Sequence, residues 1–186
     1  MKNSQLCAID ERSSALILLV KAVMWNLIFP FCFLSYYAYS EELKCSALFP
    51  PEANLSEEKS CLILDAIGVD YDPHALKLFD HGIRVCGAIN LSAKYLVLSK
   101  SSDGYIVILY GNACTSGMAG SDLVIFEKES DGSVRKVAEA VSVSNVEISN
   151  SIVDGHNSLI FHGPGLCHAI WIWNNGKYQL SNRICK

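Results

Sequence analysis

Hydrophobic and polar residues follow two different periods along the chain. Between about residues 55 and 85, apolar positions recur every three to four residues, as on one face of a helix. Ser56 precedes this pattern and predicts a helix N-cap, with two glutamates in the first turn, where the helix dipole favours acids. A second helix is predicted from Asp72-Pro73 to Gly82, because Asp-Pro is favoured where helices begin and Gly where they end. This part of the chain is therefore predicted to form a short helical pair.

From about residue 90 onward, short runs rich in Val, Ile, Tyr and Trp indicate strands. Three dipeptides separate such runs: Asp103-Gly104, Asp131-Gly132 and Asn175-Gly176. Both dipeptide types accept the positive φ of a type I′ turn, which matches the twist of paired strands. With further strands near 146–149 and 158–162, we count about eight. The predicted fold is α+β and mainly β: the helical pair packs on an antiparallel meander or sandwich.

The N-terminal region predicts export. Residues 22–37 read AVMWNLIFPFCFLSYY, a nearly unbroken apolar run preceded by Lys21. Small residues follow at Ala38 and Ser40, as expected before a cleavage site, so residues 1–40 are predicted to be a signal peptide. A retained anchor is the alternative, although the run is short for a membrane span of about 20 residues. Residues 41–186 then form one domain, with its helical part at about 55–85 and its β part at about 90–186.

The charge of residues 41–186 limits the expected partners. This part carries 17 acidic and 12 basic residues, a net charge of −5 with neutral histidines, and it has no basic cluster. Nucleic acid and anionic membrane surfaces are therefore not expected as partners, and no stable membrane insertion is expected after cleavage. An acidic surface would instead steer association with one basic protein. No motif in the chain predicts a cofactor.

Cysteine usage agrees with export to an oxidising compartment, either secreted or periplasmic. An even number of cysteines in an exported domain predicts up to three disulfides, with 15 connectivities that the sequence leaves open. No C-x-x-C pair occurs, which argues against a zinc ribbon and a thioredoxin-like redox site. The six candidates are Cys45, Cys61, Cys86, Cys114, Cys167 and Cys185.

Three histidines recur at six-residue spacing: His156, His162 and His168. A three-residue loop at 163–165 would place His162 opposite Leu166, and His162 and His168 as diagonal neighbours about 7–8 Å apart on the outer face. His156 would pair near the far end of the hairpin, roughly 13 Å away, so no three-histidine metal centre is expected. A metal at the pair would need one more ligand. The candidates for that ligand are Asp154, His74 and His81.

The same folding places the aromatic residues of this segment on the core face. Strand alternation puts Trp171, Trp173 and Tyr178 on one face together with Cys167, and His168, Ile170 and Ile172 on the other. They would otherwise be stacking platforms for a carbohydrate. Their predicted burial makes a carbohydrate- or wall-binding module an alternative rather than the first hypothesis.

A glycine-rich loop, GNACTSGMAGSD at residues 111–122, separates two predicted strands. Its glycines do not follow the phosphate-loop pattern, so we interpret it as a recognition loop tied down by a Cys114 disulfide. The side chains expected to contact a partner there are Thr115, Ser116 and Met118.

No convincing catalytic constellation occurs in this exported, acidic, cysteine-rich sequence. The first hypothesis is a small binding protein that blocks one protein partner, as an inhibitor or an immunity protein does. The expected contact residues outside the glycine-rich loop are Asp154, His156, His162 and His168. The alternative from another class is a small exported hydrolase that uses His162 or His168 as its base.

Overall fold

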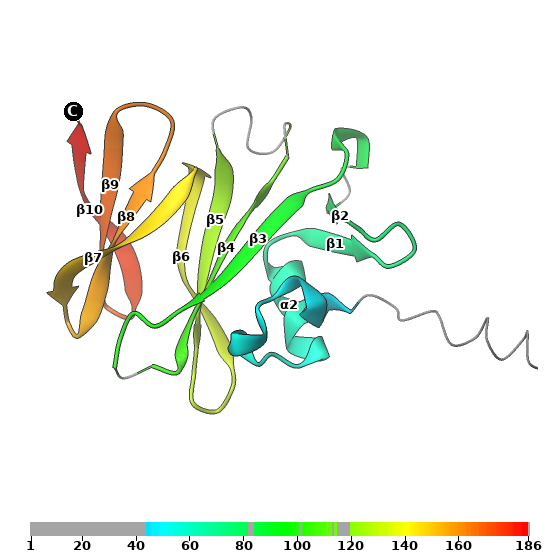
Figure 1. The fold of residues 1–186 in the computed structure, drawn as a ribbon, viewed down its shortest axis with the longest axis horizontal. Helices are drawn as coiled ribbons and strands as arrows, with labels where there is room; N and C mark the ends of the chain where they lie inside the picture. Colours follow the sequence, from blue (N-terminus) through cyan, green and yellow to red (C-terminus); the bar gives the residue numbers. More distant parts are fainter. Residues whose placement is uncertain (1–43, 82–83, 101, 113, 115–119, 186) are drawn as a thin grey trace, which may run out of the picture. The chain divides into compact units, whose positions relative to one another are not determined.

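The structure is a computed structural model that describes residues 44–81, 84–100, 102–112, 114 and 120–185 (Figure 1). The predicted signal segment, residues 1–40, lies outside the described residues. So do three predicted contact residues, Thr115, Ser116 and Met118. No helix among the described residues is long and apolar enough to span a membrane.

The described part is mostly β, in antiparallel sheets, as predicted. Its one α-helix is α2 (Glu57–Ala66), and the short 3₁₀ helices are η1 (Cys45–Leu48), η2 (Pro51–Ala53) and η3 (Arg84–Cys86). A two-stranded sheet is formed by β1 (Val69–Asp72) and β2 (Lys77–Asp80). The first four-stranded sheet contains, in spatial order, β3 (Asn90–Leu96), β4 (Gly104–Gly111), β5 (Ser121–Lys128) and β6 (Val134–Val143). The second contains β10 (Lys177–Cys185), β9 (Cys167–Asn174), β8 (His156–His162) and β7 (Asn145–Val153).

Helix α2 begins where the sequence predicts. The hydroxyl oxygen of Ser56 accepts a hydrogen bond from the backbone N–H of Lys59 at 3.3 Å. Glu57 and Glu58 occupy the first turn, where the helix dipole stabilises acids. The helix buries Ile63 and its neighbours against the first four-stranded sheet.

The predicted second helix is wrong, because residues 69–80 form a β-hairpin. The carboxylate of Asp72 accepts hydrogen bonds from the backbone N–H groups of His74 and Ala75, at 3.0 and 3.1 Å. Leu76 then adopts a positive φ of 52°, which ends any helical continuation. An aspartate before proline begins a turn as readily as a helix, and here the turn joins two short strands.

The first four-stranded sheet is buried on both faces. Along β4, Ile106 and Ile108 pack against α2 and the segment before it, while Tyr105 and Val107 face the second sheet. Consecutive buried residues explain why β4 and β5 read as continuous apolar runs instead of alternating patterns. Each such aliphatic side chain contributes about 1.5–3 kcal/mol on burial.

The two four-stranded sheets pack face to face around a second core. Leu123 and Ile125 come from the first sheet, and Leu159, Trp173 and Tyr178 from the second. The β part thus contains eight strands, but they form two sheets, and the β1–β2 hairpin forms a third.

One of the three predicted type I′ turns is confirmed. Asn175 and Gly176 have φ values of 50° and 79°, and Trp173 pairs with Tyr178 as predicted. Asp131-Gly132 lies instead in a longer connection between β5 and β6. Asp103 is the last residue of a seven-residue connection between β3 and β4, and Gly104 begins β4. Hydrogen bonds to backbone carbonyl oxygens within those connections stabilise the reversal of the chain.

Three disulfides connect the six predicted cysteines: Cys45–Cys61, Cys86–Cys114 and Cys167–Cys185. Each links residues close in sequence, with separations of 16, 28 and 18 residues. Disulfides form and persist in oxidising surroundings, so they indicate an extracellular or periplasmic environment.

Candidate functional site

A cavity of about 430 Å³ lies where the end of β6 meets the second sheet. Strand β6 contributes residues 140–143, and the walls opposite come from β8, β9, β10 and the β8–β9 connection. Figure 1 shows the start of β5 and the β8–β9 connection at this same end of the two sheets, the upper end in that view. The volume falls within the range of about 300–1,000 Å³ typical of ligand sites.

The corner at Ser142 fixes one side of the cavity. Ser142 has a positive φ of 57°. A Cβ atom on Gly163 would lie 3.0 Å from the Ser142 carbonyl oxygen, and one on Gly120 only 2.8 Å from its carbonyl carbon. Ser144 donates two hydrogen bonds, from its N–H and its hydroxyl, to the carbonyl oxygen of His162 at 2.7 and 3.1 Å. The close contacts join β6, the start of β5 and the end of β8 into one rigid corner.

Two aromatic side chains form an apolar wall of the cavity. The rings of Phe161 and Trp171 stack with centroids 4.9 Å apart and planes 28° from parallel. Phe161 is buried and Trp171 partly buried, and both pack into the core between the sheets. The wall is therefore held in place by the core behind it.

Arg183 brings a positive charge to this apolar site. It lines the cavity from β10 and is exposed, and its guanidinium makes no hydrogen bond or ion pair with the other described residues. None of the described residues that line the cavity carries a carboxylate. A carboxylate or other anion entering the cavity would therefore meet a guanidinium that has no partner among the described residues.

His162 and His168 lie directly opposite each other on β8 and β9, which corrects the predicted diagonal arrangement. Their ring centroids are 4.4 Å apart. The loop between them is two residues longer than the predicted three-residue turn at 163–165, so Leu166 belongs to the loop and does not pair with His162.

The histidine pair has one defined partner. Nε2 of His162 lies 3.1 Å from a carboxylate oxygen of Glu147. Nδ1 of His168 is buried and has no hydrogen-bond partner among the described residues. No described serine, threonine or cysteine hydrogen-bonds to either imidazole, so this part of the chain shows no nucleophile activated by a base.

His156 was predicted to be exposed at the contact surface, and the predicted exposure is wrong. Its side chain is 7% exposed and lies between the sheets, stacked on Trp173. A register shift in the β7–β8 pairing interrupts the simple alternation on which the prediction depended. Asp154 is exposed, but with a φ of 50° it forms the β7–β8 turn together with Gly155, and its carbonyl oxygen lies 2.8 Å from Nδ1 of His156.

The predicted core face of the last hairpin is partly confirmed. Trp173 and Tyr178 are buried, so neither can serve as an exposed platform for a sugar. Cys167 is exposed, contrary to prediction, because it sits at the end of its strand, where it bonds to Cys185 directly across the hairpin.

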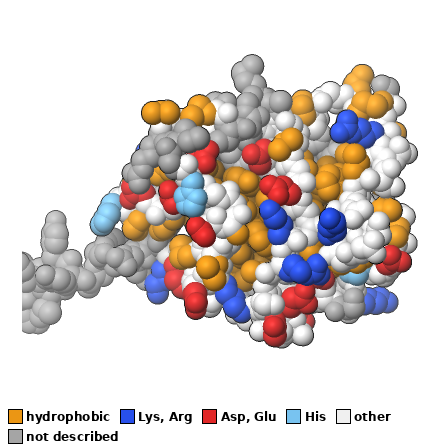
Figure 2. Space-filling model, turned by 180° about the vertical axis from the view of Figure 1, so that it is seen from behind, with side chains coloured by type: hydrophobic (Ala, Val, Ile, Leu, Met, Phe, Trp, Pro, Cys, Tyr) orange, Lys and Arg blue, Asp and Glu red, His pale blue; other side chains and the backbone are white. Residues whose placement is uncertain are grey.

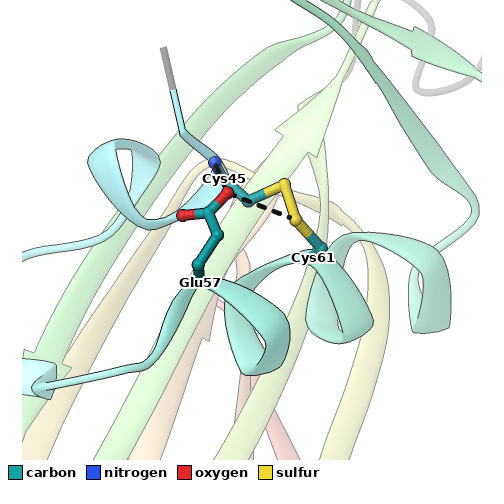
Figure 3. Close-up of side chains that lie close together, drawn as sticks. All are labelled: Cys45, Glu57 and Cys61. Carbon is teal, nitrogen blue, oxygen red and sulfur yellow. Dashed lines mark hydrogen bonds between the residues drawn. A yellow bond between two sulfur atoms is a disulfide. The ribbon is translucent and has the colours of Figure 1, made fainter. Parts of the chain in front are cut away.

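One cluster of metal-ligating residue types occurs among the described residues, and it has a structural role (Figure 3). Its two cysteines, Cys45 and Cys61, are joined in a disulfide and are not thiolates. Glu57 accepts hydrogen bonds from the N–H groups of Cys45 and Ser46, at 2.6 and 3.0 Å. Desolvation alone would raise the pKa of Glu57, but these hydrogen bonds outweigh it and lower the pKa.

The predicted metal candidates His74 and His81 belong to no such cluster among the described residues. The imidazole of His81 pairs instead with the carboxylate of Asp70 at 2.8 Å.

Charges on the surface are mixed. On the face seen in Figure 2, acidic and basic side chains are interspersed, with exposed hydrophobic side chains between them. Large exposed hydrophobic residues also line the cavity, at Val141 and Leu180. Exposed apolar area beside a cavity is typical of binding surfaces.

Comparison with protein-family models, curated proteins and solved structures gives no match to this chain.

Sequence reasoning missed Arg183 and Phe161 as site residues. A β-bulge between Leu180 and Asn182 shifts the register, so that Arg183 pairs with Ala169. Strict alternation from Leu180 would have placed Arg183 on the opposite face. The only sequence signal available was that Arg183 lies two residues before Cys185, a predicted disulfide cysteine.

Proposed function

We propose that the protein is an exported binding protein that blocks a protein partner, as an inhibitor or immunity-type protein does. In this proposal, residues 1–40 direct export and are removed. The cavity beside residues 140–143 receives an apolar side chain of the partner, and the surrounding surface covers the partner's working site.

The observation that carries this proposal is an apolar cavity with exposed hydrophobic residues at its rim. Val141 is 74% exposed and Leu180 is 46% exposed, and both line the cavity. Side chains of this kind gain free energy when a partner covers them, and binding energy concentrates where an anchor fills a pocket. The rigid corner at Ser142 and the Cys167–Cys185 disulfide hold the site in one shape, which lowers the entropic cost of binding.

The alternative of a hydrolase has less support. The pairing of His162 with Glu147 would suit a base, but catalysis also needs a nucleophile or an activated water beside it. The described residues supply no hydroxyl or thiol hydrogen-bonded to the imidazole of His162 or His168, so a binding role is favoured.

A matched pair of surface variants tests the proposed function. Val141→Arg places a charge at the rim of the cavity, and Val97→Arg makes the same change at a valine that is 66% exposed and does not line the cavity. Immobilised wild-type protein and both variants are incubated with extracellular or periplasmic extract from the native source. Retained proteins are identified by mass spectrometry, and binding is repeated with the purified partner.

The expected result is one dominant partner retained by the wild type and by Val97→Arg, with at least tenfold weaker binding to Val141→Arg, about 1.4 kcal/mol. Inhibition of the partner's own activity should follow the same order. Equal binding to all three proteins, or no saturable binding to the wild type, would contradict the proposed function.

A further inference from the structure

We propose that the cavity selects a partner segment in which an acidic side chain accompanies the apolar anchor, and that Arg183 binds the carboxylate. The inference depends on the proposed function, because it specifies the chemistry that the cavity recognises.

The apolar half of the site is built by Phe161 and Trp171. Their stacked rings, with centroids 4.9 Å apart, face the cavity and are backed by the core between the sheets. Leu180 extends the apolar surface toward solvent. Such a wall suits an aromatic or large aliphatic side chain, which gains both buried area and ring contacts.

The charged half of the site is Arg183. Strand β10 carries it on the same side as Leu180 because the bulge between Leu180 and Asn182 turns it toward the cavity. Its backbone N–H donates to the side-chain oxygen of Asn182 at 2.8 Å, whereas its guanidinium has no partner among the described residues. No described lining residue offers a carboxylate.

Docking of an apolar group at this place removes water from the guanidinium. A guanidinium that loses water without gaining a hydrogen-bond partner is destabilised. A partner that supplies an anion near its anchor is therefore favoured. Arginine favours carboxylates because its planar group forms two parallel hydrogen bonds with them.

A glutamate or aspartate side chain next to the anchor is the simplest source of that anion in a protein. The cavity lies between the end of β6 and the β8–β9 connection, and exposed hydrophobic residues lie on both, at Val141 and Leu166. A partner segment that crosses the end of β6 and the β8–β9 connection would present its side chains to the cavity, and its backbone would continue beyond the cavity in both directions. The proposal therefore commits to an internal acidic side chain and not to a terminal carboxylate.

Small peptide probes test the recognition directly. The probes are N-acetyl-Phe-Glu-amide, N-acetyl-Phe-Gln-amide and N-acetyl-phenylalanine, each titrated at millimolar concentration into the disulfide-bonded protein. Binding is followed by NMR from the indole N–H of Trp171 and the guanidinium N–H of Arg183. The Glu peptide is expected to bind at least fivefold more tightly than the Gln peptide, and Arg183→Gln should abolish that difference.

Lys177→Gln is the matched control, because Lys177 is an exposed cation on the same strand that does not line the cavity. It should leave the Glu preference unchanged. Equal binding of the Glu and Gln peptides, or no binding of either, would overturn the inference. Tightest binding of N-acetyl-phenylalanine would also overturn it, since a terminal carboxylate would then be the recognised group.

The same variants separate this inference from the proposed function. With the purified partner, Arg183→Gln is expected to weaken binding about tenfold and to reduce its dependence on salt, as loss of a charged hydrogen bond does. If Val141→Arg abolishes partner binding and Arg183→Gln does not, the proposed function stands and the carboxylate inference fails. If neither variant affects binding, both proposals fail at this cavity.

Discussion

The imidazole of His156 lies flat against the indole of Trp173, with ring centroids 4.0 Å apart and planes 9° from parallel. The edges of Tyr105 and Tyr178 close this stack, and the hydroxyl of Tyr178 donates to the carbonyl oxygen of Asn157 at 2.9 Å. The cluster sits near the β7–β8 and β9–β10 turns, at the end of the sheets away from the cavity (Figure 1). It packs the second sheet on the first at this end.

Truncation of this stack should destabilise the fold. His156→Ala removes a buried ring and its contact with the Asp154 carbonyl, so we expect a loss of about 2–3 kcal/mol in the free energy of unfolding. Urea denaturation followed by tryptophan fluorescence measures it. His156→Phe keeps a ring and should lose less, and His74→Ala, at an exposed turn, should stay within about 0.5 kcal/mol of wild type. An effect of His156→Ala as small as that of His74→Ala would contradict the structural role.

A buried carboxylate on the first sheet holds an arginine that joins the two sheets beside this stack. Glu127 accepts a hydrogen bond from the hydroxyl of Tyr105 at 2.9 Å and pairs with Arg135, whose guanidinium also donates to the carbonyl oxygen of Gly176 in the β9–β10 turn. Burial raises the pKa of Tyr105, so its hydroxyl remains a donor through the neutral range. Arg135 thus connects the first sheet to the turn of the second.

Removal of Arg135 should cost more than removal of the whole pair. Arg135→Ala leaves the buried side chain of Glu127 without its ion-pair partner, and we expect a loss of about 2–4 kcal/mol in chemical denaturation at neutral pH. The double variant with Glu127→Gln should recover part of that loss, because no unpaired charge is then buried. A double variant less stable than Arg135→Ala alone would show that the carboxylate tolerates the loss of its partner.

The sequence predicted those features that depend on local chemistry. The N-cap at Ser56, the turn at Asn175-Gly176 and the antiparallel strands all follow from residues close together in the chain. The Asp154-Gly155 turn has the same chemistry, with φ values of 50° and 80°, and the same rule would have identified it.

The candidate site was only half predictable, because register shifts decide its composition. The pairing of His162 with His168 depended on a loop length that the residues Gly163-Pro164-Gly165 do not determine. The position of Arg183 depended on a bulge with no sequence signature. Residues 140–143 join the site only through contacts between sheets, which periodicity along one strand cannot reveal.

The β1–β2 turn, which lies where the second helix was predicted, holds a leucine in a strained backbone conformation that a substitution could relieve. Leu76 holds a φ of 52° although its side chain is 60% exposed, so it accepts a left-handed conformation and gains little burial in return. Leu76→Asn should stabilise the protein by about 0.5–1 kcal/mol, because asparagine adopts this conformation more readily. The midpoint of thermal unfolding measures the gain.

Leu62 offers the matched control for that substitution. It is similarly exposed but lies inside α2, where asparagine is a poorer helix former than leucine. Leu62→Asn should therefore lower stability by about 0.5 kcal/mol. A loss of stability in Leu76→Asn as well would mean that the leucine side chain itself supports the hairpin.

Asp122 should make the protein less stable at neutral pH than its amide counterpart. Desolvation raises the pKa of Asp122, and the nearby carboxylates of Glu139 and Asp80 raise it further. The folded state therefore holds the proton more tightly than the unfolded state, so stability falls as pH rises from the unfolded value of about 3.9 through the folded pKa. Asp122→Asn should be more stable at pH 7, by on the order of 0.5 kcal/mol for a partly exposed group, and the gain should vanish below about pH 3.9.

Asp131 provides a control of opposite sign. Its carboxylate accepts the N–H of Ser133 at 2.7 Å, and this hydrogen bond lowers the pKa of Asp131. Its contribution to stability is therefore present above the unfolded pKa and is lost as pH falls through the folded value. Asp131→Asn should be less stable than wild type at pH 7 and approach it in acid. Urea denaturation at a series of pH values measures both variants, and curves that shift in the same direction would exclude the proposed electrostatic origin.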